Sequence, residues 1–514
     1  MIFTIEKDVE KMSERNEEKV LTFKEAMKRT KFGKFQITMI FISGIFMGSA
    51  FWETMGINYA LPVAECDLGI TSKSQYGLIS GVWFAGIILT SHSWGFLSDA
   101  YGRRKTLIIA SLSAFIASIL SSVANNLWQM ILFRFLNGFF ISGSTSIIFA
   151  YLGEFLGDKN RSRSMMVSSV IFGACCLALP IMAWLIINQK WQFFIPLLGI
   201  TYKPWRFFLL ACGFPSLFCG ISLFFFPESP KFTFSQGNEA KTIKILSRIY
   251  KINTGKTDFN ILKLKPSEEE TNENSKNKNV VSAMFEQTAS LCKTYPRSIG
   301  IISLLQFLIY FVSNGMLLFF PDILNQTAKF AQESSNTSDV NLCVIVENAI
   351  KEHQESFNDF TSSVCIDELE MSSYRYGMTL EVCYMLSFMI ISWLVNYTGR
   401  LAIFTFISFT TSFCGFAVNY SGTWVGTYLY VWLLGCGINI SLLNTVTYDL
   451  FPTNLRSLAM SISLMFGRLG SLVGGNIVGF LLDQYCETAF TLSGGVLLAG
   501  GILTFLIPNI IRNK

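Results

Sequence analysis

The feature that most limits how this chain can fold is a series of long apolar runs, which follow one another from residue 36 almost to the C-terminus. Runs of 18 or more apolar residues are typical of helices that cross a membrane. Lipid offers the backbone no hydrogen-bond partners, so each run must be helical. Hydrophobic residues make up 51% of the chain and charged residues only 15%, against about 25% charged in soluble domains. We therefore predict an all-α membrane protein.

Twelve runs are long enough to cross a bilayer, and they form two groups of six. The predicted spans are 36–58, 76–98, 106–124, 128–152, 164–187 and 206–226, and then 298–320, 374–396, 401–419, 424–447, 459–482 and 490–511. The expected organisation is a cytoplasmic tail (1–34), an N-terminal half (35–226), a cytoplasmic central loop (227–297), a C-terminal half (298–511) with an external loop (321–373), and a cytoplasmic end (512–514).

The distribution of basic residues orients these spans. With the N-terminus in the cytoplasm, 31 of the 40 Lys and Arg residues fall in cytoplasmic segments and seven in external loops. Cytoplasmic loops of membrane proteins carry such an excess. With twelve spans, both termini are then cytoplasmic. Because the basic residues lie in short loops between apolar spans, we expect no nucleic-acid partner.

The predicted external loop carries signs of a secretory route. It contains two glycosylation sequons, which begin at Asn325 and Asn336, and two cysteines, Cys343 and Cys365. In an oxidising compartment such a pair is a candidate disulfide. Two free thiols are the alternative, since the sequence supplies no geometry.

Two short patterns occur once in each half of the chain. Asp99-Ala-Tyr-Gly102-Arg103 ends the second span, and Asn396-Tyr-Thr-Gly399-Arg400 ends the eighth, 297 residues later. An acidic residue followed by Arg-Ser ends the fourth and tenth spans, 295 residues apart: Glu154 with Arg161, and Asp449 with Arg456. Two matches at nearly one spacing indicate duplication of a six-helix unit, and transporters are often built from two repeats with the substrate site between them.

The most specific motif runs from Gly95 to Lys105, as Gly95-Phe-Leu-Ser-Asp99-Ala-Tyr-Gly102-Arg103-Arg104-Lys105. Its glycines permit a tight turn and close helix contact. Its aspartate can pair with an arginine or face a helix N-terminus. We interpret the motif as a cytoplasmic gate that latches the halves in one state and releases them in another. A plain basic loop would explain the arginines but not the glycines and the aspartate.

This motif is similar to the signature of the major facilitator superfamily. Pro227-Glu-Ser-Pro-Lys231 and Tyr448-Asp-Leu-Phe-Pro-Thr-Asn-Leu-Arg456 resemble elements of its sugar-porter branch. Gly33-Lys-Phe-Gln36, Glu53, Leu61-Pro62 and Phe320-Pro-Asp322 resemble the synaptic vesicle glycoprotein 2 family. The sequence departs from that family at Ala50, where an aspartate is expected. The resemblance implies the twelve-helix major facilitator fold with two pseudo-repeated halves.

Two ionisable residues lie deep in predicted spans. Glu53 in the first span and Arg134 in the fourth are costly in lipid, so each must be paired, neutral or face a cavity. A carboxylate in a cavity could exchange protons or bind an organic cation. A structural ion pair between Glu53 and an arginine is the alternative, and Arg134 could equally attract an anion or pack helices.

The resemblance also implies that the first, fourth, seventh and tenth spans line the substrate cavity. On that basis the candidate lining residues are Trp52, Tyr59, Gln306, Tyr310, Asn314, Asn439 and Asn444. Buried amides can instead hydrogen-bond neighbouring helices together, and that alternative stays open.

These observations favour a transporter that moves a small organic solute by alternating access, with proton coupling as an option. An organic ion and a sugar are both open as substrates, and the embedded charges tilt the choice towards an ion. The alternative function is a transport-inactive glycoprotein that acts as a receptor or trafficking partner. No catalytic cluster or cofactor motif is visible, and two histidines, His92 and His353, nearly exclude a His-based metal site. We expect a monomer in the plasma membrane or in a secretory or synaptic-type vesicle.

Overall fold

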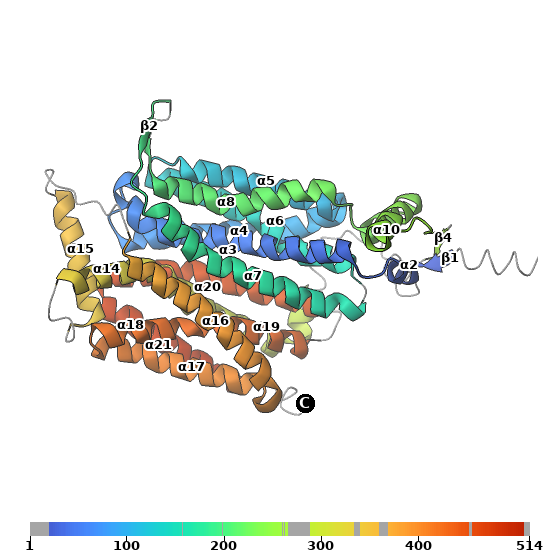
Figure 1. Ribbon diagram of the computed structural model, residues 1–514. Coiled ribbons are helices and arrows are strands. Elements are labelled where there is room, and N and C mark those ends of the chain that lie inside the picture. The colour runs from blue at the N-terminus through green and yellow to red at the C-terminus, as the bar shows by residue number, and fades with distance from the viewer. Residues whose placement is uncertain are drawn as a thin grey trace, which may run out of the picture.

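The structure is a computed structural model that describes residues 20–156, 158–197, 199–259, 261, 263–265, 288–333, 340–358, 369–451 and 455–507. Within these residues, twelve long helical spans stand side by side in two groups of six (Figure 1). The N-terminal half contains α3 (Lys34–Leu68), α4 (Lys73–Tyr101), α5 (Arg103–Ser122), α6 (Leu127–Glu154), α7 (Asp158–Ile187) and α8 (Pro204–Ser222). The C-terminal half contains α13 (Pro296–Leu317), α16 (Met371–Thr398), α17 (Arg400–Ala417), α18 (Thr423–Leu434) continued by η3 (Gly435–Gly437) and α19 (Ile438–Leu450), α20 (Arg456–Gln484) and α21 (Cys486–Leu503). The predicted twelve-helix fold is confirmed.

Helix α4 lacks the long, strongly apolar stretch that the other spans contain. Within the described residues, eleven helices are long and apolar enough to cross a membrane, and α4, with 29 residues, is not among them. Its neighbours compensate, because α4 packs closely on α6 and α20. A methyl group added at Gly86 would lie 2.5 Å from the carbonyl oxygen of Phe135. Small residues allow such close backbone approach in membranes, so protein contacts rather than lipid cover much of α4.

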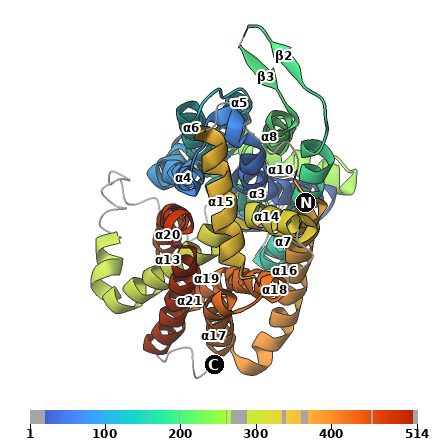
Figure 2. The same ribbon diagram turned by 90° about the vertical axis from the view of Figure 1, so that its left-hand side faces the viewer.

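Short elements collect at the two ends of the helix bundle (Figures 1 and 2). One end carries α14 (Phe320–Glu333), α15 (Leu342–Asn358) and the antiparallel hairpin of β2 (Phe193–Ile195) and β3 (Ile200–Tyr202), and we call it the α15 face. The opposite end carries α2 (Phe23–Arg29), α9 (Pro230–Ser235), α10 (Glu239–Thr254) and the parallel strands β1 (Val20–Thr22) and β4 (Lys263–Lys265), and we call it the α10 face.

Helix α10 ties the central loop to the start of the first span. Its amphipathic sequence forms a helix that begins at the capping residue Asn238 and ends at Gly255 in a left-handed conformation. The amide of Asn253 then donates to the Thr30 and Lys31 carbonyl oxygens at 3.0 and 2.9 Å, and its oxygen accepts from the Phe35 backbone at 3.1 Å. One side chain therefore joins α10 to the entry of α3.

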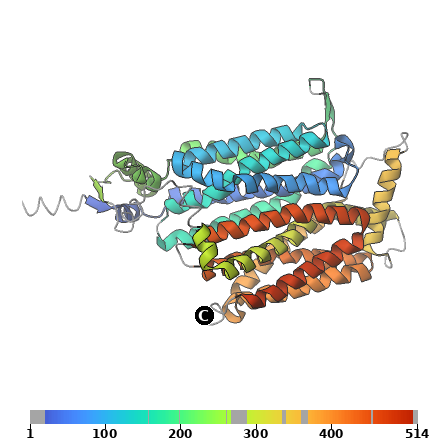
Figure 3. The same cartoon turned by 180° about the vertical axis from the view of Figure 1, so that it is seen from behind.

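The hydrophobic core shows how the two halves meet. Its largest cluster takes residues from both halves and lies towards the α15 face, for example Leu61 and Leu179 with Met316 and Leu434. Towards the α10 face the clusters separate: one belongs to the N-terminal half and another to the C-terminal half. Figure 3 shows the halves from behind, with the blue and red helices α4 and α20 in contact. The two halves thus share one hydrophobic core at the α15 face, whereas at the α10 face each half has a core of its own.

The predicted bond between Cys343 and Cys365 is wrong. Cys343, near the start of α15, is bonded to Cys486, the first residue of α21, with Cα atoms 5.5 Å apart. The cause is tertiary, because α15 lies across the ends of the C-terminal helices, where it contacts both α20 and α21. Cys66 is also in a disulfide, and Cys365 lies outside the described residues.

The two glycosylation sequons begin at Asn325 and Asn336, and the structure describes only the first of these asparagines. Asn325 is fully buried within α14, and its side-chain oxygen accepts a 2.7 Å hydrogen bond from the Glu370 backbone. A glycan on Asn325 is incompatible with this packing. Asn336 lies outside the described residues, so its glycosylation stays a prediction.

Candidate functional site

A narrow pocket lies between the two halves. The residues that line it come from α3 and α7 on one side and from α13, α14 and α16 on the other: Phe51, Met55, Asn58, Tyr59, Leu179, Pro180, Leu317, Phe320, Pro321, Gly377, Leu380 and Glu381. Its free volume of about 20 Å³ is room for one water molecule. We call it the inter-half pocket, and in this conformation it is closed.

Glu381 is the one ionisable carboxylate in this lining. It lies ten residues into α16, about 15 Å along the helix at about 1.5 Å per residue, and it is half-buried. Within the described part of the chain its side chain forms neither a hydrogen bond nor an ion pair. Sequence reasoning missed this residue, although a glutamate seven residues inside the predicted span 374–396 is a signal that a search for embedded charges should find.

Tyr59 closes the pocket on its α15 side. Its ring stacks on that of Tyr374, with centroids 6.2 Å apart and planes 7° from parallel. A methyl group at Gly377 would lie 2.5 Å from the Tyr59 hydroxyl oxygen, so a side chain at residue 377 would force Tyr59 to move. The structure brings the predicted candidate Tyr59 to the pocket. The neighbouring candidate Trp52 is turned away, and its Nε1 donates to the Cys175 carbonyl oxygen of α7 at 2.7 Å.

Glu53 and Arg134 lie inside the N-terminal half and face each other. Each is only 2% exposed, and Arg134 Nη1 lies 3.9 Å from Glu53 Oε2. Arg134 also donates to the Glu53 carbonyl oxygen. The Glu53 carboxylate accepts from Ser118 of α5 and, at 3.1 Å, from Asn137 of α6. In this conformation the pair joins α3, α5 and α6, which is the structural alternative that the sequence left open.

The amide candidates of the C-terminal half also connect helices. Gln306 donates to Asn444 at 3.1 Å, which links α13 to α19. Asn314 donates to Ser471 of α20 at 2.7 Å, and Asn439 donates to Ser408 of α17 at 2.9 Å.

Tyr310 lies against α20, where a methyl group at Gly467 would come within 2.9 Å of its ring. Among the described residues, the buried side-chain oxygens of Gln306 and Asn439 accept no hydrogen bond. Of all the predicted lining residues, the structure brings Tyr59 alone to the inter-half pocket.

The motif that runs from Gly95 to Lys105 forms a compact cluster at the α10 face. Arg103 pairs with Asp99 at 2.7 Å and with Glu154 at 3.2 Å. The Arg104 backbone donates to Glu228 at 2.9 Å, while its guanidinium donates to the Leu223 carbonyl oxygen at 2.8 Å. Glu228 belongs to the Pro227–Lys231 element, so two motifs that are distant in sequence meet here.

The second copy of this turn lies between α16 and α17. Gly399 has φ +80° where Gly102 has φ +105°, so both glycines turn the chain in a conformation that other residues avoid. Arg400 begins α17 as Arg103 begins α5. The structure does not describe four side chains of the predicted gate, so their part in it stays a prediction: Arg161, Asn396, Asp449 and Arg456.

Ion pairs and charged hydrogen bonds join the two halves at the α15 face. Lys73, at the start of α4, pairs with Glu65 at 2.9 Å and with Asp322 of the other half at 3.0 Å. The Lys73 and Ser74 backbones donate to Asp483 of α20 at 2.7 and 2.8 Å. All three charged partners come from different helices, so separating the halves here breaks several contacts at once.

Asn188 and Tyr374 add to this closure on the other edge of the α15 face. Tyr374 donates to the Asn188 side-chain oxygen at 2.7 Å, and the Asn188 amide donates to the Leu369 carbonyl oxygen at 2.8 Å. On the α10 side of the pocket, Arg468 of α20 donates to Ser91 of α4 at 2.5 Å, which is a further contact between the halves.

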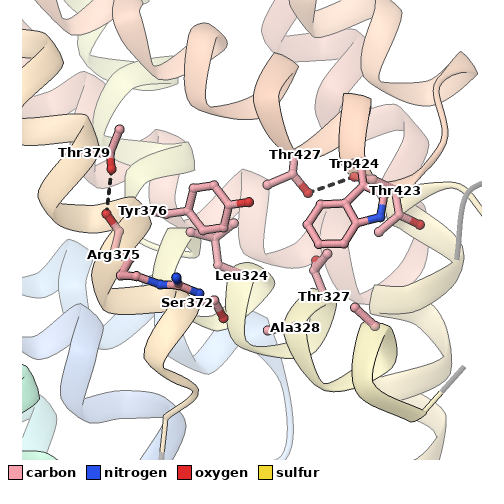
Figure 4. A pocket seen from close by; sticks show the side chains of 11 residues that line it. Leu324, Thr327, Ala328, Ser372, Arg375, Tyr376, Thr379, Thr423, Trp424 and Thr427 are labelled. Carbon is pink, nitrogen blue, oxygen red and sulfur yellow. Dashed lines mark hydrogen bonds between the residues drawn. The ribbon is translucent and has the colours of Figure 1, made fainter.

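A second, wider pocket lies entirely within the C-terminal half at the α15 face (Figure 4). It has a free volume of about 280 Å³, and α14, α16 and α18 line it. Because none of the described residues of the N-terminal half borders it, this pocket is separate from the interface along which the two halves meet.

Two six-helix halves, a repeated turn between paired helices and a pocket at the interface are the architecture of the major facilitator class. The family model described as sugar (and other) transporter matches residues 12–351, more than half of the chain. The chain therefore belongs to the sugar (and other) transporter family.

The chain is similar to relatives of two kinds. It is 29% identical over 240 residues to human synaptic vesicle glycoprotein 2A, an alignment that covers 46% of this chain and 32% of that protein. The match thus spans only about a third of that relative. It is also 26% identical over 514 residues to the organic cation/carnitine transporter 7 of Arabidopsis thaliana, covering 95% and 94% of the two chains.

Solved structures share the fold. The partially occluded, inward-open xylose transporter XylE from E. coli superposes with a TM-score of 0.62 at 13% identity, covering 92% of this chain and 97% of that one. A bacterial homologue of the human lysosomal transporter Spinster in an inward-facing conformation gives 0.60 at 12% identity, covering 93% and 98%. These likenesses carry the architecture alone.

Proposed function

We propose that this protein moves a small organic cation across its membrane by alternating access. The observation that carries the proposal is Glu381, a carboxylate without a partner among the described residues, in an apolar and aromatic pocket between the halves. A charge left unpaired at that depth is costly unless a ligand or a proton compensates it. The rings of Phe51, Tyr59 and Phe320 in the same lining suit the apolar body of an organic cation and attract its charge.

The contacts between the halves support alternating access. The shared core and the Lys73 pairs close the pocket towards the α15 face, while separate cores leave the halves independent at the α10 face. A solute would therefore reach Glu381 from the α10 side once the halves part there, and breaking the Lys73 contacts would open the opposite path.

The same proposal includes the orientation of the protein in its membrane and the coupling of solute movement to protons. The excess of basic residues favours a cytoplasmic α10 face, so the α10 side is the inward side in this proposal. A carboxylate that binds either a cation or a proton couples the two, because each displaces the other. The synaptic vesicle relatives favour a vesicle membrane, and the organic cation/carnitine relative supports the substrate class.

The test is uptake into proteoliposomes with an imposed pH gradient, using tetraethylammonium, carnitine and xylose as separate probes. We expect cation uptake by the wild type. In Glu381→Gln the apparent KM should rise at least about tenfold, since a hydrogen bond to a charged group contributes about 1.5–3 kcal/mol. Glu487→Gln, which removes an exposed carboxylate at the start of α21, is the matched control and should behave as wild type.

Each other outcome is informative. Xylose uptake that is insensitive to Glu381→Gln would replace the cation with a sugar. If folded protein moves none of the probes in either gradient direction, the receptor or trafficking alternative gains over transport.

A further inference from the structure

The wider pocket at the α15 face is built from one side of each of three helices. Ser372, Arg375, Tyr376 and Thr379 follow one another at the three- and four-residue spacing of a single α16 face. Leu324 and Ala328 of α14 form an apolar wall, and Thr423, Trp424 and Thr427 of α18 form the third side. Figure 4 shows Arg375 reaching beneath Tyr376 towards Ser372, with Trp424 on the opposite side of the pocket.

Two polar groups of this pocket, on Arg375 and Trp424, have no partner among the described residues. Within the described residues, neither the Arg375 guanidinium nor the Trp424 indole nitrogen forms a hydrogen bond or ion pair. The threonine hydroxyls at 379 and 427 donate to carbonyl oxygens of their own helices, which leaves their oxygens as acceptors only. The donors available to a ligand thus include the exposed guanidinium of Arg375, which lies close to the positive N-terminus of α16, and the indole N–H of Trp424. This combination suits an anion.

The position of the pocket indicates where that anion comes from. Trp424 and Tyr428 are 50% and 62% exposed near the start of α18, and Tyr428 packs edge-on against Tyr376. Exposed Trp and Tyr at the end of a span are typical of the headgroup level of a bilayer. The apolar wall of α14 would be unfavourable for a free inorganic anion but would fit the glycerol and first methylenes of a lipid.

We propose that this pocket binds the phosphate headgroup of an anionic phospholipid, with Arg375 as its ionic partner. Guanidinium groups recognise phosphate through paired hydrogen bonds, and the volume of about 280 Å³ accommodates a headgroup without its acyl chains. The site lies outside the inter-half pocket, so it does not depend on the proposed cation transport.

The experiment measures lipid retained by the purified protein. Wild type, Arg375→Gln and Lys351→Gln are exposed to dihexanoyl phosphatidylglycerol, dihexanoyl phosphatidylcholine, or sodium phosphate, and bound ligand is counted by native mass spectrometry while the shift in Tm is recorded. Lys351 is an exposed cation of α15 on the same face and controls for general charge attraction. Trp424→Leu is a second variant that keeps the charge but removes the indole donor.

We expect wild type to retain phosphatidylglycerol over phosphatidylcholine, with about a tenfold loss of affinity in Arg375→Gln. A smaller loss is expected in Trp424→Leu, and none in Lys351→Gln. Equal retention by wild type and Arg375→Gln would overturn the proposal. So would sodium phosphate that protects as well as the lipid does, because the ligand would then be a free anion. Glu381→Gln should leave lipid retention unchanged.

Discussion

Gly377 is a residue at which the closed inter-half pocket has little room for a side chain. Any side chain there would meet the Tyr59 hydroxyl, which lies 2.5 Å from the position of a methyl group. We expect Gly377→Val to destabilise the closed pocket by about 1–3 kcal/mol, the usual cost of overpacking. The measurement is Tm in detergent together with solute uptake. Gly495→Val is the control, because Gly495 has open space around its Cα; equal effects of the two substitutions would contradict the prediction.

The sequence predicted individual site residues when their position within one span was enough. It failed when the role of a residue depended on its partners from other helices. Tyr59 was identified by its place in the first span, and the structure puts it at the pocket. Glu53 attracted the functional hypothesis because it is a carboxylate in lipid, yet its ion pair with Arg134 occupies it. Glu381 has no such partner among the described residues, and only the tertiary packing around each side chain distinguishes the two carboxylates.

At the scale of elements, Glu53 and Arg134 hold three helices together. Loss of the Arg134 charge is expected to be costly. In Arg134→Met the Glu53 carboxylate would stay buried without its cation, which costs about 3–5 kcal/mol. We expect a large fall in Tm and in the yield of folded protein. The double variant Glu53→Gln/Arg134→Met should recover part of that loss, because no buried charge is then left over. Wild-type stability of the single variant would refute the prediction.

The helices themselves could be predicted because lipid imposes them, and α4 followed from the apolar run at 76–98. The disulfide could not, since Cys343 meets Cys486 across 143 residues of chain. That pairing depends on where α15 lies, and an amphipathic helix outside the membrane has no hydropathy signal that says which spans it covers.

At the scale of the whole molecule, Lys73 biases the balance between the two states. Removing the cation in Lys73→Met penalises the arrangement in which Glu65 and Asp322 are buried close to it, whereas separated halves would let water reach both carboxylates. We expect the α15 face to open more often. The readout is labelling of Tyr374→Cys, a position that is fully buried here, by a membrane-impermeant maleimide. Lys351→Met is the control, and unchanged labelling would rule the idea out.

The duplicated motifs predicted two halves correctly, but they could not reveal which end of the bundle is closed. Both states use the same helices, and a transporter sequence must stabilise each of them. The difference lies in a few contacts between halves, such as Tyr59 on Tyr374, which join residues far apart in the chain.

The hydrogen bonds of Asn253 decide where this polypeptide can be divided. They fasten α10 to the residues that lead into α3, so the first part of the central loop belongs to the N-terminal half. A break between Lys265 and Thr288 would yield two fragments with one six-helix unit each and this joint intact. A break before Asn238 would instead separate α10 from the N-terminal half to which it is hydrogen-bonded. Co-expressed fragments or an inserted fluorescent domain should therefore use the position between Lys265 and Thr288.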